Sequence, residues 1–183
     1  TYTYDPKDPT PYVTDPISLQ LGEASEQQAI ERRMDVLVYS TPPLKKDTIV
    51  CGRVFAELYI STDVKGTDFT GKLVDVWPNG KAIQICDGIQ RAEFRNSLAK
   101  AEWLKAGKVY KVTIDIWATG IRFFKGHQIR LEISSAAAPK FSPHLNTDTD
   151  QADETKAIVA HQTIHHSKKY PSALIVDVVP EKA

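Results

Sequence analysis

Apolar and polar residues alternate along several segments of this 183-residue chain, and this pattern limits the possible folds more than any other feature. In residues 54–60 every second residue is apolar, and residues 110–116 and 127–133 repeat the scheme. A period of two places alternate side chains on opposite faces of a strand, with one face on a core and the other in water. The same reasoning predicts further strands near residues 34–40, 69–77, 81–86, 89–94, 157–165 and 173–179.

Turn-forming residues separate these segments. They occur at Asn79-Gly80, Asp87-Gly88, Ala106-Gly107-Lys108 and Lys125-Gly126, where glycine and asparagine supply the backbone conformations that tight turns need. No amphipathic helix of ordinary length is indicated after residue 34. Roughly nine or ten short strands at this spacing predict an all-β sandwich or barrel. The alternation alone leaves jelly-roll, immunoglobulin-like and barrel topologies open.

Residues 1–33 have a different character, because they contain Pro6, Pro9, Pro11 and Pro16. Each proline removes a backbone donor and restricts the residue before it. We therefore expect 1–33 to be an extended, irregular segment on the surface rather than part of a central sheet, with at most one short helical turn in residues 23–33. The β-domain is expected to span 34–183. Its long polar stretch 134–153 predicts a loop that is either functional or mobile.

The bulk composition limits the possible partners. Basic and acidic residues balance at 23 each, which argues against a nucleic-acid partner, since polyanions favour a basic face. No apolar run is long enough to span a bilayer, so no membrane partner is expected, and the compartment stays open.

Cys51 and Cys86 are expected to be buried free thiols. Neither lies in a Cys-x-x-Cys pair, so a zinc or redox role has little support.

One continuous stretch points to a family. Residues 67–82 have the sequence TDFTGKLVDVWPNGKA and continue into Cys86-Asp87-Gly88-Ile89, which predicts a β-hairpin. The stretch closely resembles a signature in the C-terminal β-domain of the serine hydrolases that include X-Pro dipeptidyl-peptidases, cocaine esterase, α-amino-acid ester hydrolases and glutaryl-cephalosporin acylases. Further segments resemble the family in the same order, namely residues 1–9, 35–41, 87–92, 94–97, 107–110, 124–130, 133–135, 139–141, 145–147 and 166–172.

The resemblance implies a jelly-roll β-sandwich similar to galactose-binding domains. It also implies that 1–33 joins this domain to an upstream α/β-hydrolase domain of the same polypeptide, and a start at Thr1 beside the Tyr-Asp-Pro run is what a cut at a domain boundary would give. Through that domain the parent protein would act on a small peptide, ester or acyl-amide substrate. Two departures from the family pattern, Ala136-Ala137-Ala138 and Asp148, lie in the 134–153 loop.

The catalytic residues of such a hydrolase are not expected in this chain. The family's serine occupies a Gly-x-Ser-x-Gly elbow between a strand and a helix, and no serine here has glycines two positions to either side. The resemblance places the other triad members upstream as well. We therefore expect no catalytic residue, no cofactor and no activity in this chain alone.

The segment after the Asp-Pro run supplies the candidates for a substrate cleft or a domain interface. In relatives, the matching region contributes apolar residues to the substrate pocket. The corresponding candidates are Tyr12, Ile17, Leu19 and Leu21, of which the last three alternate in an otherwise polar region. An equally weighted interpretation is that they only cover the edge of the sandwich.

The sequence allows three other functional interpretations, as a carbohydrate-binding module, a metal site or a serine–histidine pair, beside a calcium-binding loop. A free-standing jelly-roll module could bind carbohydrate through exposed aromatic residues, with Trp77 the best candidate, although strand aromatics more often pack. A metal site at His161, His165 and His166 has little support, because His161 and His165 would lie roughly 13 Å apart on a strand. Pairing of Ser134 or Ser135 with His127 would lack an oxyanion site. The acidic residues Asp148, Asp150, Asp153 and Glu154 make calcium a minority hypothesis, with a solvated loop the default.

Overall fold

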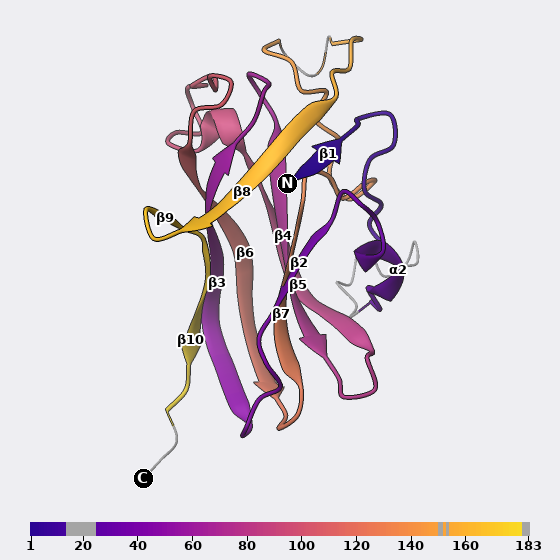
Figure 1. The fold of residues 1–183 in the computed structure, drawn as a ribbon, viewed down its shortest axis with the longest axis vertical. Helices are drawn as coiled ribbons and strands as arrows, with labels where there is room; N and C mark the ends of the chain where they lie inside the picture. The colour runs from indigo at the N-terminus through magenta and orange to yellow at the C-terminus, as the bar shows by residue number, and fades with distance from the viewer. Residues whose placement is uncertain (14–24, 150–151, 153, 181–183) are drawn as a thin grey trace.

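The computed structural model describes residues 1–13, 25–149, 152 and 154–180, and its strands form two antiparallel sheets (Figure 1). The prediction of an all-β sandwich is therefore confirmed, whereas the jelly-roll topology stays a prediction. One sheet contains β1 (Tyr2–Tyr4), β3 (Thr48–Ser61), β6 (Tyr110–Phe123), β8 (Ala160–Ser167), β9 (Tyr170–Pro171) and β10 (Ala173–Val178). The other has the order β2 (Leu37–Ser40), β7 (Gln128–Ser134), β4 (Asp68–Val76), β5 (Ala82–Arg91).

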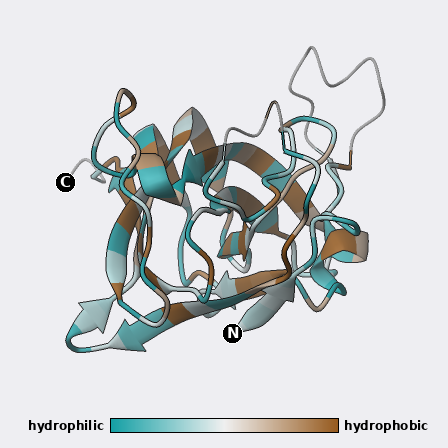
Figure 2. Ribbon diagram, turned by 90° about the horizontal axis from the view of Figure 1, so that it is seen from above, coloured by the Kyte–Doolittle hydropathy of each residue, from teal (hydrophilic) through white to brown (hydrophobic). Residues whose placement is uncertain are grey.

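The core lies between the two sheets. Val54, Ala56, Leu58 and Ile60 point inward from β3 and are buried, as their alternation predicts. The facing sheet contributes, among others, Phe69 and Leu73 of β4 and Leu131 and Ile133 of β7. Seen from above, brown and teal residues alternate along the strands that enclose this core (Figure 2).

Asp87-Gly88 does not form the predicted turn. β5 is one strand that passes through both residues and pairs with β4, with Gly88 opposite Gly71. A Cβ atom at Gly88 would lie 1.9 Å from the carbonyl oxygen of Asp115 in the other sheet. Glycine is needed here because the two sheets approach closely, which explains why a turn-like dipeptide lies inside a strand. The strands predicted at 81–86 and 89–94 are thus one strand, followed by a 3₁₀ turn (Ala92–Phe94).

The first residues depart from the prediction of an irregular surface segment. β1 pairs antiparallel with β8 at the edge of the six-stranded sheet. Tyr2 and Tyr4 are buried, and their hydroxyls bond to Ser135 Oγ at 2.8 Å and to the carbonyl oxygen of His144 at 3.0 Å. A three-residue strand before Pro6 is too short to give a clear alternating pattern, so the sequence did not indicate it.

The later part of the N-terminal segment pairs with the free edge of β5 in the four-stranded sheet. Gln84 donates its backbone N–H to the carbonyl of Ser25 at 2.9 Å, and Gln27 donates to Ala82 at 2.8 Å. A single helical turn, α2 (Gln28–Glu31), follows and buries Ile30. Among the described residues no helix is long and apolar enough to cross a membrane.

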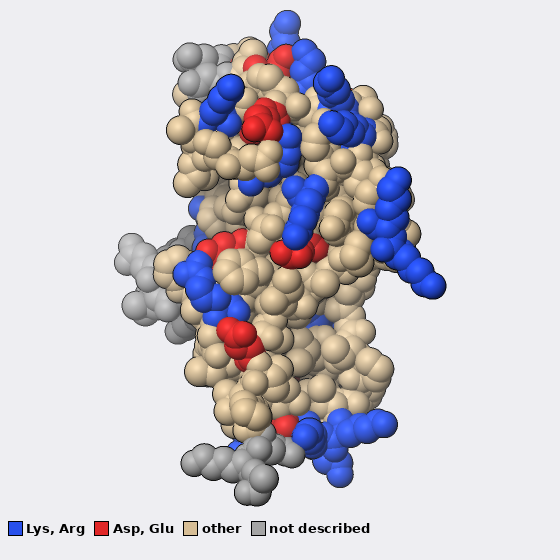
Figure 3. All heavy atoms as spheres, turned by 90° about the vertical axis from the view of Figure 1, so that its left-hand side faces the viewer, with Lys and Arg blue, Asp and Glu red and all other residues tan. Residues whose placement is uncertain are grey.

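Charged side chains of both signs share the outer surface. On the side of β9 and β10, Lys and Arg side chains gather toward the upper part and the lower tip, with acidic side chains among them (Figure 3). Lys111 pairs with Glu57 at 2.8 Å on the outside of the six-stranded sheet.

Cys51 on β3 is exposed, so the expectation of a buried thiol is wrong for it, while Cys86 is half-buried. Burial raises the pKa of the Cys86 thiol to about 11.

Candidate functional site

Tyr12, the one interface candidate within the described residues, anchors the N-terminal segment to the outer face of the four-stranded sheet. Its backbone N–H donates to the carbonyl of Ala138 at 2.7 Å, and its side chain is buried. The hydroxyl accepts hydrogen bonds from Gln84 Nε2 at 2.8 Å and from Lys140 Nζ at 3.3 Å. It donates to Asp87 Oδ1 at 3.4 Å. The tyrosine is therefore held by both its backbone and its hydroxyl.

A row of three charged residues crosses the same face of the sheet. Lys72 on β4 lies opposite Asp87 of β5 on one side and opposite Glu132 of β7 on the other. Lys72 and Glu132 are almost fully buried, and Lys72 Nζ lies 3.8 Å from Glu132 Oε2. Lys72 Nζ also donates to Gln27 Oε1 at 2.8 Å, so it connects the row to the N-terminal segment.

The carbonyl and carboxylate oxygens of this face are incompletely paired. Both carboxylate oxygens of Glu132, together with Asp87 Oδ2 and Gln84 Oε1, are buried without a hydrogen-bond partner. Burial raises the pKa of the Glu132 carboxyl to about 8, and it lowers the pKa of the Lys72 ammonium. Buried polar groups in folded proteins are nearly always hydrogen-bonded, so an unpaired group requires an explanation.

The other interface candidates, Ile17, Leu19 and Leu21, lie outside the described residues. On either side of the segment that contains them, Tyr12 is fixed to the sandwich through Ala138, and Ser25 is hydrogen-bonded to the edge strand β5.

The sequence had no signal for the charged row. Lys72, Asp87 and Glu132 lie side by side on three neighbouring strands. They share a face that an isolated sheet would expose to water, and Tyr12, Gln27 and Ile30 of the N-terminal segment lie against it.

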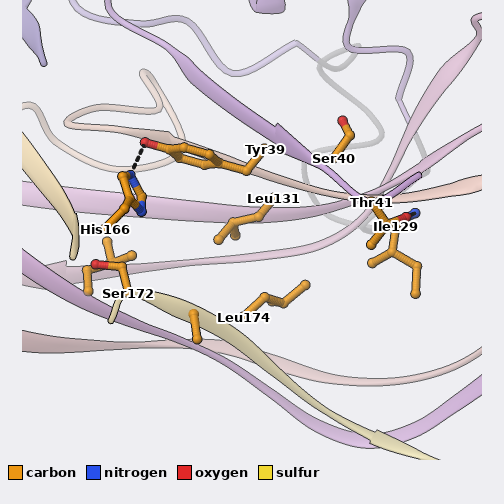
Figure 4. A pocket seen from close by; sticks show the side chains of 10 residues that line it. Tyr39, Ser40, Thr41, Ile129, Leu131, His166, Ser172 and Leu174 are labelled. Carbon is orange, nitrogen blue, oxygen red and sulfur yellow. Dashed lines mark hydrogen bonds between the residues drawn. The ribbon is translucent and has the colours of Figure 1, made fainter. Parts of the chain in front are cut away.

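An apolar groove of about 240 Å³ lies between the edges of the two sheets, away from the charged row (Figure 4). Its walls include Leu58, Ile129 and Leu131. At its rim Tyr39 and His166 share a hydrogen bond of 2.9 Å between the hydroxyl and Nε2. Nothing in this arrangement resembles a nucleophile beside an oxyanion site.

The histidines form separate pairs rather than one cluster. Their partners are Asp75 for His127, Glu93 for His144, Asp63 for His161, Ser61 for His165 and Tyr39 for His166. Among the described residues no group of three or more His, Cys, Asp or Glu side chains could hold a metal ion. Ser134 and Ser135 do not pair with His127, because their hydroxyls are hydrogen-bonded to those of Thr10 and Tyr2.

The remaining candidates behave as surface residues. Asp148 forms an ion pair with Lys65 at 2.6 Å, while Asp150 and Asp153 lie outside the described residues. Trp77, expected to be the best exposed aromatic candidate, is 40% exposed, whereas Trp117, a lower-ranked aromatic candidate, is 71% exposed. Residue 117 has a positive φ of 85° at an irregularity between β3 and β6, which strand periodicity cannot anticipate.

Comparisons with known proteins identify the family. A model of the X-Pro dipeptidyl-peptidase C-terminal non-catalytic domain matches residues 1–175. The chain belongs to this family. Cocaine esterase from Rhodococcus sp. (strain MB1 Bresler) is 38% identical over 183 residues, which cover 98% of this chain and 32% of that enzyme.

Solved structures agree on the fold. An aminopeptidase from the marine sediment archaeon Thaumarchaeota archaeon superposes with a TM-score of 0.89 at 26% identity, covering 98% of this chain and 33% of that protein. An α-amino-acid ester hydrolase superposes with a TM-score of 0.88 at 22% identity, covering 97% of this chain and 32% of that protein. The chain thus spans about a third of the length of these relatives.

Proposed function

We propose that this non-catalytic domain stabilises an α/β-hydrolase domain of the same polypeptide and forms part of the wall of its substrate cleft. The observation that supports this most directly is the charged row of Asp87, Lys72 and Glu132 beneath the N-terminal segment. A buried face with four unpaired oxygens is incomplete by itself. Because these oxygens have almost no exposed surface, another domain would contact the N-terminal segment that covers the row rather than the row itself.

The position of the N-terminal segment supports the second half of the proposal. The described residues on either side of 14–24 are fixed to the sandwich, Tyr12 by its hydrogen bond to Ala138 and Ser25 by its hydrogen bond from Gln84. Pockets often form where two domains meet, and a segment anchored at both ends can present side chains without losing its position. Ile17, Leu19 and Leu21 are the residues through which it would contact an apolar part of the substrate.

Catalysis would reside in the upstream domain. The reaction would be acyl transfer to water through an acyl-serine, with a peptide, ester or acyl amide as the substrate. The name of one relative, cocaine esterase, and those of two structural neighbours, an aminopeptidase and an α-amino-acid ester hydrolase, fall within this range. The domain itself would contribute binding and stability, and no nucleophile.

Hydrolysis of a p-nitrophenyl ester and an X-Pro p-nitroanilide, by this chain alone and by the full polypeptide, tests the proposal. We expect the chain to be inactive and the full polypeptide to show serine-dependent activity. Activity in the isolated chain would contradict the non-catalytic role and redirect attention to Ser134, Ser135 and the histidines.

The contribution to the cleft needs its own test in the full polypeptide. We expect Ile17→Ala and Leu19→Ala to raise KM several-fold while the thermal midpoint changes little. Leu98→Ala is a matched control, because Leu98 is an aliphatic residue that is 88% exposed and remote in sequence from the segment. Unchanged kinetics with a large loss of stability would instead support a role in covering the sandwich edge.

A further inference from the structure

Three connections between strands meet at one end of the sandwich, which is the lower end in Figure 1. They are residues 41–47 between β2 and β3, residues 77–81 between β4 and β5, and residues 124–127 between β6 and β7. The strand pairing places them together, because the start of β3 pairs with the end of β6, and the end of β4 pairs with the starts of both β5 and β7. These three connections, together with Arg122 at the end of β6, are called the cationic tip below.

The charge of this tip differs from that of the chain as a whole. It carries five cationic side chains and one carboxylate, namely Lys45, Lys46, Lys81, Arg122 and Lys125, and Asp47. All five cationic residues are exposed, and Arg122 forms an ion pair with Asp47. Figure 3 shows Lys and Arg side chains gathered at this lower tip. Because acidic and basic residues balance over the whole chain, the tip is a local excess of positive charge that attracts an anionic partner.

Two large aromatic side chains share this surface with the cations. Trp77 is 40% exposed, and Phe124 is 51% exposed. Lys81 Nζ lies 5.3 Å from the centroid of the Trp77 ring, and the guanidinium carbon of Arg122 lies 5.1 Å from that of Phe124. The ring of His127 contacts both aromatic rings, with centroid distances of 5.8 Å to Trp77 and 5.7 Å to Phe124. Each exposed aromatic ring of the tip therefore has a cation beside it.

Hydrogen bonds hold the tip in one arrangement. The backbone N–H of Leu44 donates to the carbonyl of His127 at 2.8 Å, and the N–H of Gly126 donates to the carbonyl of Leu44 at 2.9 Å. Asp75 accepts from His127 Nδ1 at 2.9 Å and from Trp77 Nε1 at 3.0 Å. The three connections thus form one surface, and a surface that is already ordered loses less conformational entropy on binding.

We propose that the cationic tip attaches the protein to a membrane surface that contains anionic lipids. Clustered Lys and Arg side chains are attracted to negative headgroups, and tryptophan rings favour the boundary between headgroups and acyl chains. Attachment at the surface needs no membrane-spanning segment. A single-stranded nucleic acid fits the tip less well, because such strands follow a charged groove, whereas these cations lie on the ends of three turns.

The opposite end of the sandwich offers a matched comparison. The connection from residue 95 to residue 109 lies there, since it leads to the start of β6, which pairs with the end of β3. It contains the exposed residues Lys100, Trp103 and Lys105, so the same residue types occur at both ends. Acidic side chains accompany them at this end, for example Glu102, which pairs with Arg95 at 3.1 Å. We therefore expect only the cationic tip to bind an anionic surface.

Sedimentation of the full polypeptide with lipid vesicles tests the proposal. Vesicles of phosphatidylcholine and phosphatidylserine in equal amounts are compared with vesicles of phosphatidylcholine alone. We expect the wild type to bind only the vesicles with phosphatidylserine, and Lys45→Glu/Lys125→Glu to lower the partition coefficient at least about tenfold. Lys100→Glu/Lys105→Glu has the same net charge and should leave the coefficient unchanged. Absence of binding by the wild type, or an equal loss in the two double variants, would overturn the proposal.

Removal of an aromatic ring separates docking on a lipid surface from attraction between charges alone. Phe124→Ala should weaken binding to the phosphatidylserine vesicles several-fold, whereas Leu98→Ala, at an 88% exposed residue of the opposite end, should not. Unchanged binding by Phe124→Ala would overturn the proposal, and so would tighter binding of a single-stranded oligonucleotide than of the vesicles. The proposed function does not depend on these results, because its failure would appear as activity of the isolated chain.

Discussion

Two buried polar clusters lie beneath irregular segments of this molecule, and they differ in how completely their atoms are paired. One lies under the long loop after β7, and the other lies under the N-terminal segment. The His144 cluster comprises Thr67, Glu93, His144 and Asn146. The Lys72 cluster comprises Tyr12, Lys72, Gln84, Asp87 and Glu132.

In the His144 cluster all the buried side-chain oxygens but one are hydrogen-bonded, the exception being Oε1 of Gln162, whose Nε2 donates to Thr67 Oγ1 at 2.8 Å. His144 Nδ1 accepts from the backbone N–H of Asn146 at 2.8 Å, so Nε2 carries the proton and donates to Glu93 Oε1 at 2.9 Å. Glu93 Oε2 accepts from the backbone N–H of Thr67, and Thr67 Oγ1 donates to Asn146 Oδ1. This cluster fixes the loop to the sandwich, and only one of its oxygens is unpaired.

The Lys72 cluster leaves four oxygens unpaired although it is equally buried. A satisfied network stabilises one structure, whereas a partly satisfied one costs stability unless another group completes it. On the proposed function, the His144 cluster would serve the fold and the Lys72 cluster would support an interface with another domain. The predictions below test this distinction, beginning with the largest expected effect.

Replacement of His144 should have the largest effect on the stability of the chain. His144→Ala removes the imidazole donor from the buried Glu93 carboxylate, which keeps only the Thr67 N–H and Arg91 Nε at 3.8 Å, and we expect a loss of about 3 kcal/mol in the free energy of unfolding. Urea denaturation of the chain measures it. His161→Ala is the control, since His161 and its partner Asp63 are both exposed, and it should change stability by less than about 1 kcal/mol. Similar losses for both variants would contradict a structural role for the His144 cluster.

Removing one member of the Lys72–Glu132 pair should cost less than removing His144. Lys72→Met leaves Glu132 buried without its cation, but that carboxyl can take up a proton, so we expect a loss of about 2 kcal/mol at pH 9 and a smaller loss at pH 6. The double variant Lys72→Met/Glu132→Met should recover most of this stability, because a buried ion pair can be replaced by apolar side chains at little cost. A double variant as unstable as the single one would show that the pair is needed for the fold itself.

The pH dependence of stability should single out Glu132. Its pKa is raised by burial to about 8 in the folded chain, whereas an unfolded glutamate titrates near 4.3. Between these values the folded state holds a proton that the unfolded state has lost, so the contribution of Glu132 to stability is present at low pH and is lost as pH rises through about 8.

Comparison with Glu132→Gln isolates that contribution. The free energy of unfolding of the wild type, relative to Glu132→Gln, should fall by on the order of 2 kcal/mol between about pH 4.5 and pH 8. Thermal or urea unfolding across that range measures the difference. A constant difference between the two proteins would mean that Glu132 titrates as it does in the unfolded chain.

The contrast between the clusters also explains which parts of the structure could be predicted from the sequence and which could not. Alternation along β3, β6 and β7 predicted strands and their inward faces, because burial of one side of a sheet imposes a period of two. It could not predict the Lys72 cluster, since burial of an outer face depends on which distant segment covers it. Gly88 was misassigned for a related reason, as its need for space comes from Asp115 in another sheet.

The smallest expected effect concerns the hydroxyl of Tyr12. Tyr12→Phe keeps the ring but removes the atom that bonds Gln84, Asp87 and Lys140. Because Lys140 still pairs with Asp87 at 2.6 Å, we expect the chain to lose only about 1 kcal/mol. In the full polypeptide the same change should raise KM, since Tyr12 anchors one end of the 14–24 segment. The control is Tyr39→Phe. Tyr39 lies at the rim of the apolar groove, and its substitution should leave KM unchanged. If both variants left KM unchanged, the unpaired oxygens of the Lys72 cluster would have no connection to substrate binding, and the two clusters would differ in pairing but not in role.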